Sequence, residues 1–486
     1  MLRRLILATL LAAGAAHAEL PEPIAALLQT ARIPQEAVGV VVLRGDATVV
    51  SHNADRSMQP ASTMKLFTTM VGLEQLGPVF RGRTELRSSA SIFRGTLMGD
   101  LYLRGGADAD FNEDVLAHML QALRNQGIKS IKGNVILDRQ LFQPARTDLD
   151  APPFDEYPWA YYNVIPDALL INTNLLKIEL RSTADGLSVA MMPEMEKVSI
   201  DPQMKLSDAP CASWENGWRA PDVARKDDKL VVALHGSFPR DCARSISVNV
   251  LDRHDYLERL LRATWRRLGG KLSGEVREDV TPPDTRLLAD HVSRTLPEIL
   301  RDTNKQSDNT LARTIFLSLG SLEADAALGS HPIAVAPAPG ETTATRADLA
   351  VRGWLLRHNI NDQGLVLENG SGLSRLERAT PGQLAGVLQA GQKSLWMPEF
   401  LSSLPIAAVD GTMRKRLKDS PAAARARLKT GSLSGVIAVA GYVPDANNQP
   451  CVVVAIINHE LVANGAGRTV LDGVIDWVAR SSAPAR

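Results

Sequence analysis

A serine and a lysine in this chain have the types and spacing needed for nucleophilic catalysis. Ser62 and Lys65 lie three positions apart, at the start of an apolar stretch that repeats every three and four residues. Residues three apart on a helix share one face, so we expect Lys65 beside Ser62. A serine needs a neighbouring base to become a nucleophile. Lys65 can be that base if burial, the positive helix N-terminus and a second cation at Lys429 lower its pKa.

Two further motifs contain polar residues of similar chemical interest. The triplet SDN occupies 307–309 before a helical stretch, and KTG occupies 429–431 before an apolar strand. Each motif alone has a purely structural explanation: Ser62 and Ser307 as helix caps, and Gly431 as a strand bulge. All three motifs in this order arise by chance in roughly one chain in a hundred. A shared active site explains them together.

Several other kinds of site are not expected from the sequence. It contains no HExxH motif, no paired-histidine metal spacing, no G-x-S-x-G motif and no P-loop, so we expect neither a metal nor a cofactor. The 54 basic and 54 acidic residues give a net charge of zero, which argues against nucleic-acid binding. A charged fraction of 22% at ordinary hydrophobicity excludes a disordered chain.

Residues 1–18 have the features of a secretory signal peptide. A basic start is followed by an apolar run over 5–16 and by an A-x-A cleavage site at 16–18. A buried N-terminal helix is the alternative. The run is too short to span a bilayer, and no later stretch is long enough to do so. No cysteine follows the cleavage site, so we expect an exported protein that begins near Glu19 and has no lipid anchor.

The order of the other elements predicts an α+β fold with a largely antiparallel sheet. Alternating apolar residues indicate a hairpin over 38–53 and a strand pair over 436–458. The double proline at 282–283 marks a domain boundary. The helices expected from repeats of three and four cover 62–77, 114–128, 256–270, 296–302 and 469–480. Additional strands are expected at 133–138, 175–180, 229–236 and 245–250.

Export would allow the three cysteines to form a disulfide. Cys211 and Cys242 lie in polar, loop-like sequence, whereas Cys451 opens an apolar run. We expect Cys211 and Cys242 to pair, which stabilises the chain by roughly 3 kcal/mol in the chain-entropy model. Cys451 is then a small buried apolar residue. Three free thiols remain the alternative, because connectivity cannot be deduced from sequence.

The three motifs together are the signature of penicillin-binding proteins and class A β-lactamases. About half of the chain separates Ser62 from Ser307, a far longer interval than in class A β-lactamases. The chain therefore resembles the class C low-molecular-mass penicillin-binding proteins, the D-alanyl-D-alanine carboxypeptidase/endopeptidases. Further stretches that match this family are PASTMKLFTT at 60–69, GDLYLRGGAD at 99–108, GSGLSR at 370–375, DGTM at 410–413 and KTGS at 429–432.

The resemblance implies a particular domain organisation. A β-lactamase/transpeptidase-like domain, an antiparallel sheet flanked by helices, would be built from 19–83 and 283–486. The insertion over 84–282 would contain two smaller strand-rich domains, one nested in the other, with the inner one at about 108–185.

The resemblance also implies roles for the catalytic residues. Ser62 would attack the carbonyl between the last two D-alanines of a peptidoglycan stem peptide, and Lys65 would accept its proton. Ser307 would relay a proton to the departing D-alanine, while Asn309 would hydrogen-bond the substrate backbone. Water would then release the acyl group from Ser62.

The third motif would bind the substrate. Lys429 and Thr430 would hold its terminal carboxylate, and the strand that continues through Gly431 and Ser432 would lie beside it. The backbone N–H groups of Ser62 and Ser432 would form the oxyanion hole, in which each donor contributes ~3–4 kcal/mol.

Three more residues are candidates for contacts with the substrate side chain. Arg375 matches an arginine that the family places there. The family also has an acidic residue five positions before an aromatic one in the insertion. If Tyr162 is this aromatic residue, the fifth position before it is Tyr157, and Asp155 is a nearby acid. An ordinary exposed loop is the alternative for Asp155 and Tyr162.

These inferences predict an exported serine carboxypeptidase/endopeptidase of the periplasm, soluble or loosely associated with the membrane. Its substrates would be stem peptides ending in D-Ala-D-Ala and cross-linked peptides, and β-lactam antibiotics would inhibit it. A serine β-lactamase that deacylates quickly is an alternative, against which the long insertion and the lack of an omega-loop glutamate motif argue. A non-catalytic wall-binding protein with the same fold is another.

Overall fold

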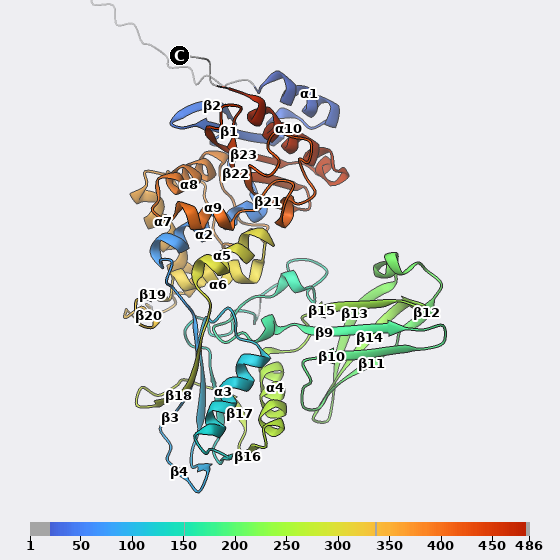
Figure 1. Ribbon diagram of the computed structural model, residues 1–486, viewed down its shortest axis with the longest axis vertical. Helices are drawn as coiled ribbons and strands as arrows, with labels where there is room; N and C mark the ends of the chain where they lie inside the picture. The colour runs from blue at the N-terminus through green and yellow to red at the C-terminus, as the bar shows by residue number, and fades with distance from the viewer. Residues whose placement is uncertain (1–19, 150, 336–337, 483–486) are drawn as a thin grey trace, which may run out of the picture.

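The computed structural model describes residues 20–149, 151–335 and 338–482. The expected signal peptide at 1–18 lies outside this range. The chain forms an upper part that contains both ends of the described sequence and a lower part that contains the inserted segment (Figure 1). Both parts combine helices and sheets, so the α+β class is confirmed. Within the described ranges, no helix is long and apolar enough to cross a membrane.

The upper part is built on a five-stranded antiparallel sheet in the order β2-β1-β23-β22-β21. The hairpin expected at 38–53 and the strand pair expected at 436–458 are both present, and β1 pairs with β23. This pairing joins the beginning and the end of the fold. The strand bounds are β1 Val38–Arg44, β2 Ala47–His52, β21 Arg427–Leu433, β22 Val436–Pro444 and β23 Pro450–Asn458.

Helices cover both faces of this sheet, which is why β23 is apolar along nearly its whole length. Val452, Val454 and Ile456 face one core, and the alternate residues Val453 and Ala455 face another. The second core is closed by α1 (Glu22–Ala31) and α10 (Ala466–Arg480). The first is closed by α2 Lys65–Gln75, α5 Leu296–Lys305, α6 Asn309–Leu319, α7 Thr343–Arg357, α8 Pro381–Lys393 and α9 Met397–Ser403.

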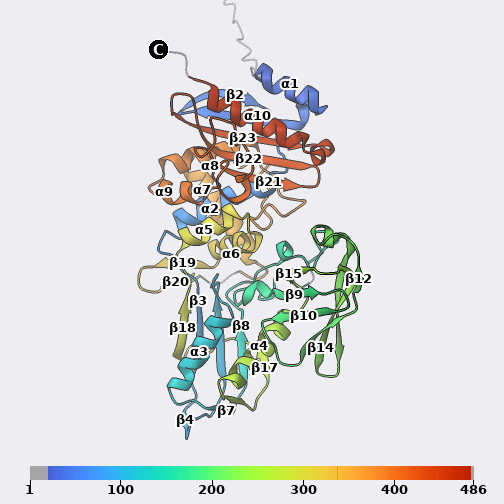
Figure 2. The ribbon, with the colours of Figure 1, turned by 45° about the vertical axis from the view of Figure 1, so that its right-hand side comes forward.

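The lower part contains a second five-stranded sheet in the order β17-β8-β6-β3-β18. It packs with α3 (Glu113–Asn125) and α4 (Arg253–Arg267) around one hydrophobic core. A small sheet, β16-β7-β5-β4, closes the lower end (Figure 2). The bounds are β3 Arg83–Ser88, β4 Ile92–Phe93, β5 Thr96–Leu97, β6 Leu101–Gly106, β7 Ser130–Ile131, β8 Val135–Asp138, β16 Lys271–Leu272, β17 Val276–Glu278 and β18 Arg286–Val292.

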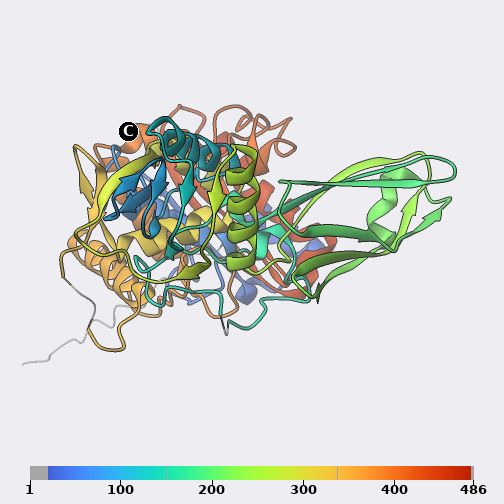
Figure 3. The ribbon, with the colours of Figure 1, turned by 90° about the horizontal axis from the view of Figure 1, so that it is seen from below.

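Seven more strands form a lobe that projects sideways, clearest when the molecule is seen from below (Figure 3). One sheet has the order β10-β9-β15, and the other joins β11, β12 and β13 to β14. In this lobe Cys211 and Cys242 form a disulfide, with 5.4 Å between their Cα atoms. The strands are β9 Leu176–Ser182, β10 Leu187–Met192, β11 Val198–Pro202, β12 Lys205–Ser207, β13 Trp218–Lys226, β14 Lys229–Pro239 and β15 Ala243–Val248.

Strand pairing divides the insertion differently from the inner domain expected at about 108–185. Strand β8 pairs with β6 and β17, so it belongs to the larger inserted sheet, whereas the projecting lobe begins only with β9. Strand β18 follows the boundary expected at 283, yet it pairs with β3 of the insertion. Local periodicity identifies a strand but does not select its distant partner.

Candidate active site

Ser62 lies in a short 3₁₀ turn, Ala61–Met64, that leads directly into α2. No side chain caps either the turn or the helix, so Ser62 is not a capping residue. Strand β21 passes close beside the turn. A Cβ atom added at Gly431 would lie 3.0 Å from the backbone nitrogen of Ser62, so glycine allows this approach.

Lys65 is completely buried and directs its ammonium group at three acceptors. Its Nζ donates to Ser62 Oγ at 3.1 Å, to Asn309 Oδ1 at 2.7 Å and to the carbonyl oxygen of Ser371 at 2.5 Å. The serine and lysine of the first motif thus lie on one face, as their spacing predicts. On this face Lys65 also contacts the side-chain amide of Asn309, which belongs to the second motif.

Burial lowers the pKa of Lys65 to about 7. The negative charges of Asp308 and Glu377 oppose this shift, and the positive charge of Arg313 adds to it. A base is most effective when its pKa lies near the pH of the reaction. Near neutral pH a large fraction of Lys65 is uncharged and can accept the proton of Ser62.

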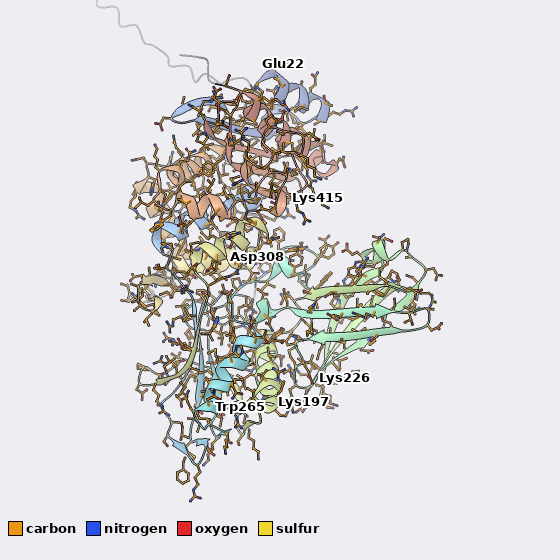
Figure 4. All side chains as sticks on the ribbon, in the orientation of Figure 1. Glu22, Lys197, Lys226, Trp265, Asp308 and Lys415 are labelled. Atoms are coloured by element: carbon orange, nitrogen blue, oxygen red, sulfur yellow. A yellow bond between two sulfur atoms is a disulfide. The ribbon has the colours of Figure 1, made fainter. Side chains whose placement is uncertain are left out.

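Ser307 precedes α6 in a left-handed backbone conformation, with a φ of 61°. Asp308, and not Ser307, caps the helix: its side chain accepts the N–H of Leu311 at 2.9 Å. Ser307 Oγ instead accepts a hydrogen bond from Lys429 Nζ at 2.8 Å. Residues other than glycine rarely adopt this conformation, and those that do cluster at functional sites. Asp308 lies where the upper part faces the lower part (Figure 4).

Lys429 is a second completely buried amine, on β21. Besides Ser307, its Nζ bonds the carbonyl oxygen of Thr430 at 2.8 Å. Burial and the positive charge of Lys65 hold the pKa of Lys429 well below its usual range. The hydroxyl of Thr430 contacts that of Thr412 at 2.7 Å. A bound carboxylate would favour the charged form of Lys429, so this position is suited to an anion.

Asn309 connects the two motifs to the insertion. Its Oδ1 accepts from Lys65, and its Nδ2 donates to the backbone carbonyl of Tyr162 at 3.1 Å. The side chain of Tyr162 donates from its hydroxyl to Asp155 Oδ2 at 2.9 Å, and Asn163 Nδ2 donates to Asp155 Oδ1 at 2.8 Å. Burial, with the hydrogen bond to Asp155, raises the pKa of Tyr162 to about 12. Asp155 and Tyr162 therefore form an ordered, half-buried pair beside Asn309.

Arg375 lies on the same side of the site. Its guanidinium group is 4.9 Å from the ring centroid of Phe154, the neighbour of Asp155. Arg375, Phe154, Asn163 and Arg313 all line a cavity of about 720 Å³ between the insertion and the helices of the upper part. Of the three residues suggested for side-chain contacts, Arg375 lines this cavity, while Asp155 and Tyr162 lie next to its lining residues Phe154 and Asn163.

Two residues outside the three motifs hold Lys65 in place. Ser371 provides the carbonyl oxygen that Lys65 contacts, and Glu377 anchors the loop containing Ser371. Glu377 is buried, with 1% of its surface exposed. Its carboxylate accepts hydrogen bonds of 2.8 to 3.2 Å from four backbone N–H groups. The donors are Glu368, Asn369, Gly370 and Gly372. Burial raises the pKa of Glu377, and these bonds oppose that rise.

Close backbone packing also fixes this loop against the turn of the nucleophile. Gly372 has a φ of 80°, and a Cβ atom there would lie 2.0 Å from the carbonyl oxygen of Ala61. Of these features, only the glycines within GSGLSR were visible in the sequence. No local sequence pattern indicated that Glu377 would be buried. No group of side chains able to hold a metal ion occurs within the described parts of the chain.

Comparisons with known proteins agree with this geometry. D-alanyl-D-alanine carboxypeptidase DacB of Haemophilus influenzae is 27% identical over 447 residues, covering 88% of this chain and 87% of that protein. D-alanyl-D-alanine carboxypeptidase of Actinomadura sp. (strain R39) is 28% identical over 451 residues, covering 89% and 80%.

The fold is also that of a solved relative. The crystal structure of penicillin binding protein 4 (dacB) from H. influenzae superposes with a TM-score of 0.71 at 26% identity, covering 90% of this chain and 93% of that one. The structure of the same protein in complex with a β-lactam superposes with a TM-score of 0.70 at 24% identity, covering 93% of this chain and 99% of that one. These matches confirm the resemblance to the class C penicillin-binding proteins. A model of the D-Ala-D-Ala carboxypeptidase 3 (S13) family matches residues 20–481, so the chain belongs to that family.

Proposed function

We propose that this protein is a penicillin-binding serine D-Ala-D-Ala carboxypeptidase that works through an acyl-enzyme on Ser62. The observation that carries the proposal is the 3.1 Å hydrogen bond between Lys65 Nζ and Ser62 Oγ, in a buried site where the pKa of Lys65 is about 7. Family membership and the named activity of its relatives support the same reaction.

The proposed reaction has four steps. Uncharged Lys65 accepts the proton of Ser62 as Oγ attacks the carbonyl carbon. The backbone N–H groups of Ser62 and Ser432 stabilise the oxyanion. Ser307, hydrogen-bonded to Lys429, passes a proton to the departing amine and takes up in its place the proton that Lys65 received from Ser62, which leaves Lys65 uncharged again. Water then attacks the ester, and Ser62 recovers its proton.

Substrate binding uses both sides of the site. Lys429 and Thr430 hold the terminal carboxylate of a peptidoglycan stem peptide, and Asp155, Tyr162 and Arg375 contact its side chain. Cross-linked peptides bind in the same way, which gives endopeptidase activity. β-Lactams acylate Ser62 because they present a reactive carbonyl and a carboxylate to the same groups.

The rest of the proposal concerns location and organisation. The signal peptide at 1–18 directs the protein to the periplasm. The catalytic domain comprises the upper sheet and its helices, and the inserted sheet and projecting lobe are separate units.

Intact-protein mass spectrometry after brief benzylpenicillin treatment, beside a Ser62→Ala variant, tests the proposal. A persistent penicilloyl adduct on the wild type, absent from the variant, is expected, together with release of D-alanine from a stem pentapeptide. An adduct that disappears within seconds while penicillin is consumed would indicate a β-lactamase. No adduct on folded protein would overturn the acyl-enzyme mechanism and favour a non-catalytic binding protein.

A further inference from the structure

The small sheet at the lower end of the molecule has an exposed outer face. Phe93 pairs with Thr96, and Thr96 and Lys271 each pair with Ser130 in the neighbouring strand. Residues paired across strands point to the same side of a sheet, so Phe93 and Lys271 share one face. Lys132 lies two residues beyond Ser130 on the same side.

The tip of this sheet presents apolar side chains to solvent. Phe93 is 60% exposed, Ile92 40% and Met98 41%. The tight turn after Phe93 consists of Arg94 and Gly95, both with positive φ, and the Arg94 guanidinium lies 5.3 Å from the Phe93 ring centroid. In Figures 1 and 2 this hairpin forms the end of the molecule opposite α1 and α10.

The exposed charges at this tip are mainly positive, although Asp100 and Glu275 border it. The chain as a whole is neutral, yet the segments 91–99, 125–133 and 264–274, which form this end, contain no aspartate or glutamate. Their exposed cations include Arg94, Lys129, Lys132 and Lys271. None of these four forms an ion pair with any residue that the structure describes. We call Ile92, Phe93, Arg94, Met98, Lys129, Lys132 and Lys271 the basic hairpin end.

We propose that the basic hairpin end docks on the surface of an anionic phospholipid bilayer. Exposed apolar side chains surrounded by cations suit the headgroup region, where the apolar groups enter the interface and the cations meet anionic lipid. A neutral protein partner would not require a cluster of unpaired cations, and an anionic wall polymer would not require the exposed Phe93 and Ile92. Lipid accounts for both features together.

Docking in this way would be peripheral and reversible. Because the basic hairpin end and the sheet carrying Lys429 lie at opposite ends of the long axis (Figure 1), docking would hold the active site away from the bilayer. The inference goes beyond the proposed function and does not depend on acylation of Ser62, so the two can fail separately.

Cosedimentation of the purified protein with vesicles tests the proposal. We expect binding to vesicles of equal phosphatidylcholine and phosphatidylglycerol, little binding to pure phosphatidylcholine, and release at high salt. Both Ile92→Ser/Phe93→Ser and Lys129→Gln/Lys132→Gln should lower the affinity roughly tenfold. The controls, Leu395→Ser and Lys415→Gln/Lys418→Gln, change exposed residues of the upper part and should bind like the wild type. Unchanged penicillin acylation in every variant shows that it is folded.

Several results would overturn the proposal. One is the absence of binding to the anionic vesicles, and another is equal binding by the hairpin variants and the wild type. Variants that bind vesicles normally but lose binding to purified peptidoglycan would assign this end to the wall. Variants that change the oligomeric state in analytical ultracentrifugation would instead assign it to a second copy of the chain.

Discussion

The carbonyl oxygen of Ser371 lies 2.5 Å from Nζ of Lys65, although 306 positions separate the two residues in the chain. This contact, together with those to Ser62 and Asn309, provides the buried amine with three acceptors. The base is therefore positioned by three separate segments. Its low pKa is a property of the assembled site and not of the helix that carries it.

The pKa of Lys65 leads to a prediction on the pH dependence of acylation. Because Lys65 must be uncharged to accept a proton, the acylation rate should rise as the pH increases through about 7 and then level off. Stopped-flow measurement of acylation by a chromogenic β-lactam across pH 5–9 would check this. Lys65→Arg, which stays charged, should abolish acylation. A rate that is independent of pH in the wild type would contradict this role.

Glu377 is predicted to act as a positioning residue through Ser371 and Lys65. Glu377→Gln replaces an acceptor oxygen with an amide that faces N–H donors, so the loop should shift and acylation should fall by roughly tenfold or more. Loss of the negative charge also lowers the pKa of Lys65, so the rising limb of the pH profile should move to lower pH.

The pH at which the acylation rate rises distinguishes a positioning role of Glu377 from a general loss of stability. Lower stability alone does not change that pH. Glu323→Gln, an exposed residue of β19 (Leu322–Asp325), provides the matched loss of charge and should leave both rate and limb unchanged. If the acylation rate of Glu377→Gln rose at the same pH as in the wild type, Glu377 would not act on Lys65.

Thr412 is expected to orient the hydroxyl of Thr430. Their oxygens are 2.7 Å apart, so Thr412→Val removes one hydrogen bond, worth about 1 kcal/mol, from the group proposed to bind the substrate carboxylate. The KM for a stem pentapeptide should rise by roughly fivefold. Steady-state D-alanine release would measure this. A peptide whose terminal carboxylate is amidated should show no such difference between variant and wild type.

Asp155 is predicted to affect peptides but not penicillin. Its carboxylate holds Tyr162 and Asn163 beside the cavity near Arg375, where the proposed function places the substrate side chain. Asp155→Asn should lower kcat/KM for a stem peptide with an amino group on that side chain by roughly tenfold. Acylation by benzylpenicillin, which has no such group, should be unchanged. Equal losses on both compounds would indicate a general structural role instead.

The disulfide is predicted to stabilise the projecting lobe alone. Cys211 and Cys242 are 31 positions apart, so Cys211→Ser/Cys242→Ser should lower the stability of the lobe by about 3 kcal/mol. Limited proteolysis should then cleave within 176–248 sooner than in the wild type. Penicillin acylation should be unaffected, because Lys65 bonds to Ser62, Asn309 and Ser371, and none of these residues lies in the lobe. A matching loss of acylation would show that the lobe supports the active site.

Many secondary-structure elements and the reactive side chains of this protein could be predicted from local sequence patterns. Ser62, Lys65, SDN and KTG were recognisable because reactive side chains at short spacing on a helix or strand are a local property. The hairpin at 38–53 and the strand pair at 436–458 were predictable for the same reason, since alternation of apolar residues is also local.

The tertiary structure alone decided how these pieces meet. The pairing of β1 with β23, the assignment of β8 and β18 to the inserted sheet, and the left-handed conformation of Ser307 all depend on contacts between distant segments. The same holds for the burial of Glu377 and Lys429. A pKa is set by desolvation and neighbouring charges, which no short stretch of sequence contains. The residue types therefore indicate which reaction is chemically available, and the packing sets the pKa values of the two buried amines that the reaction would use.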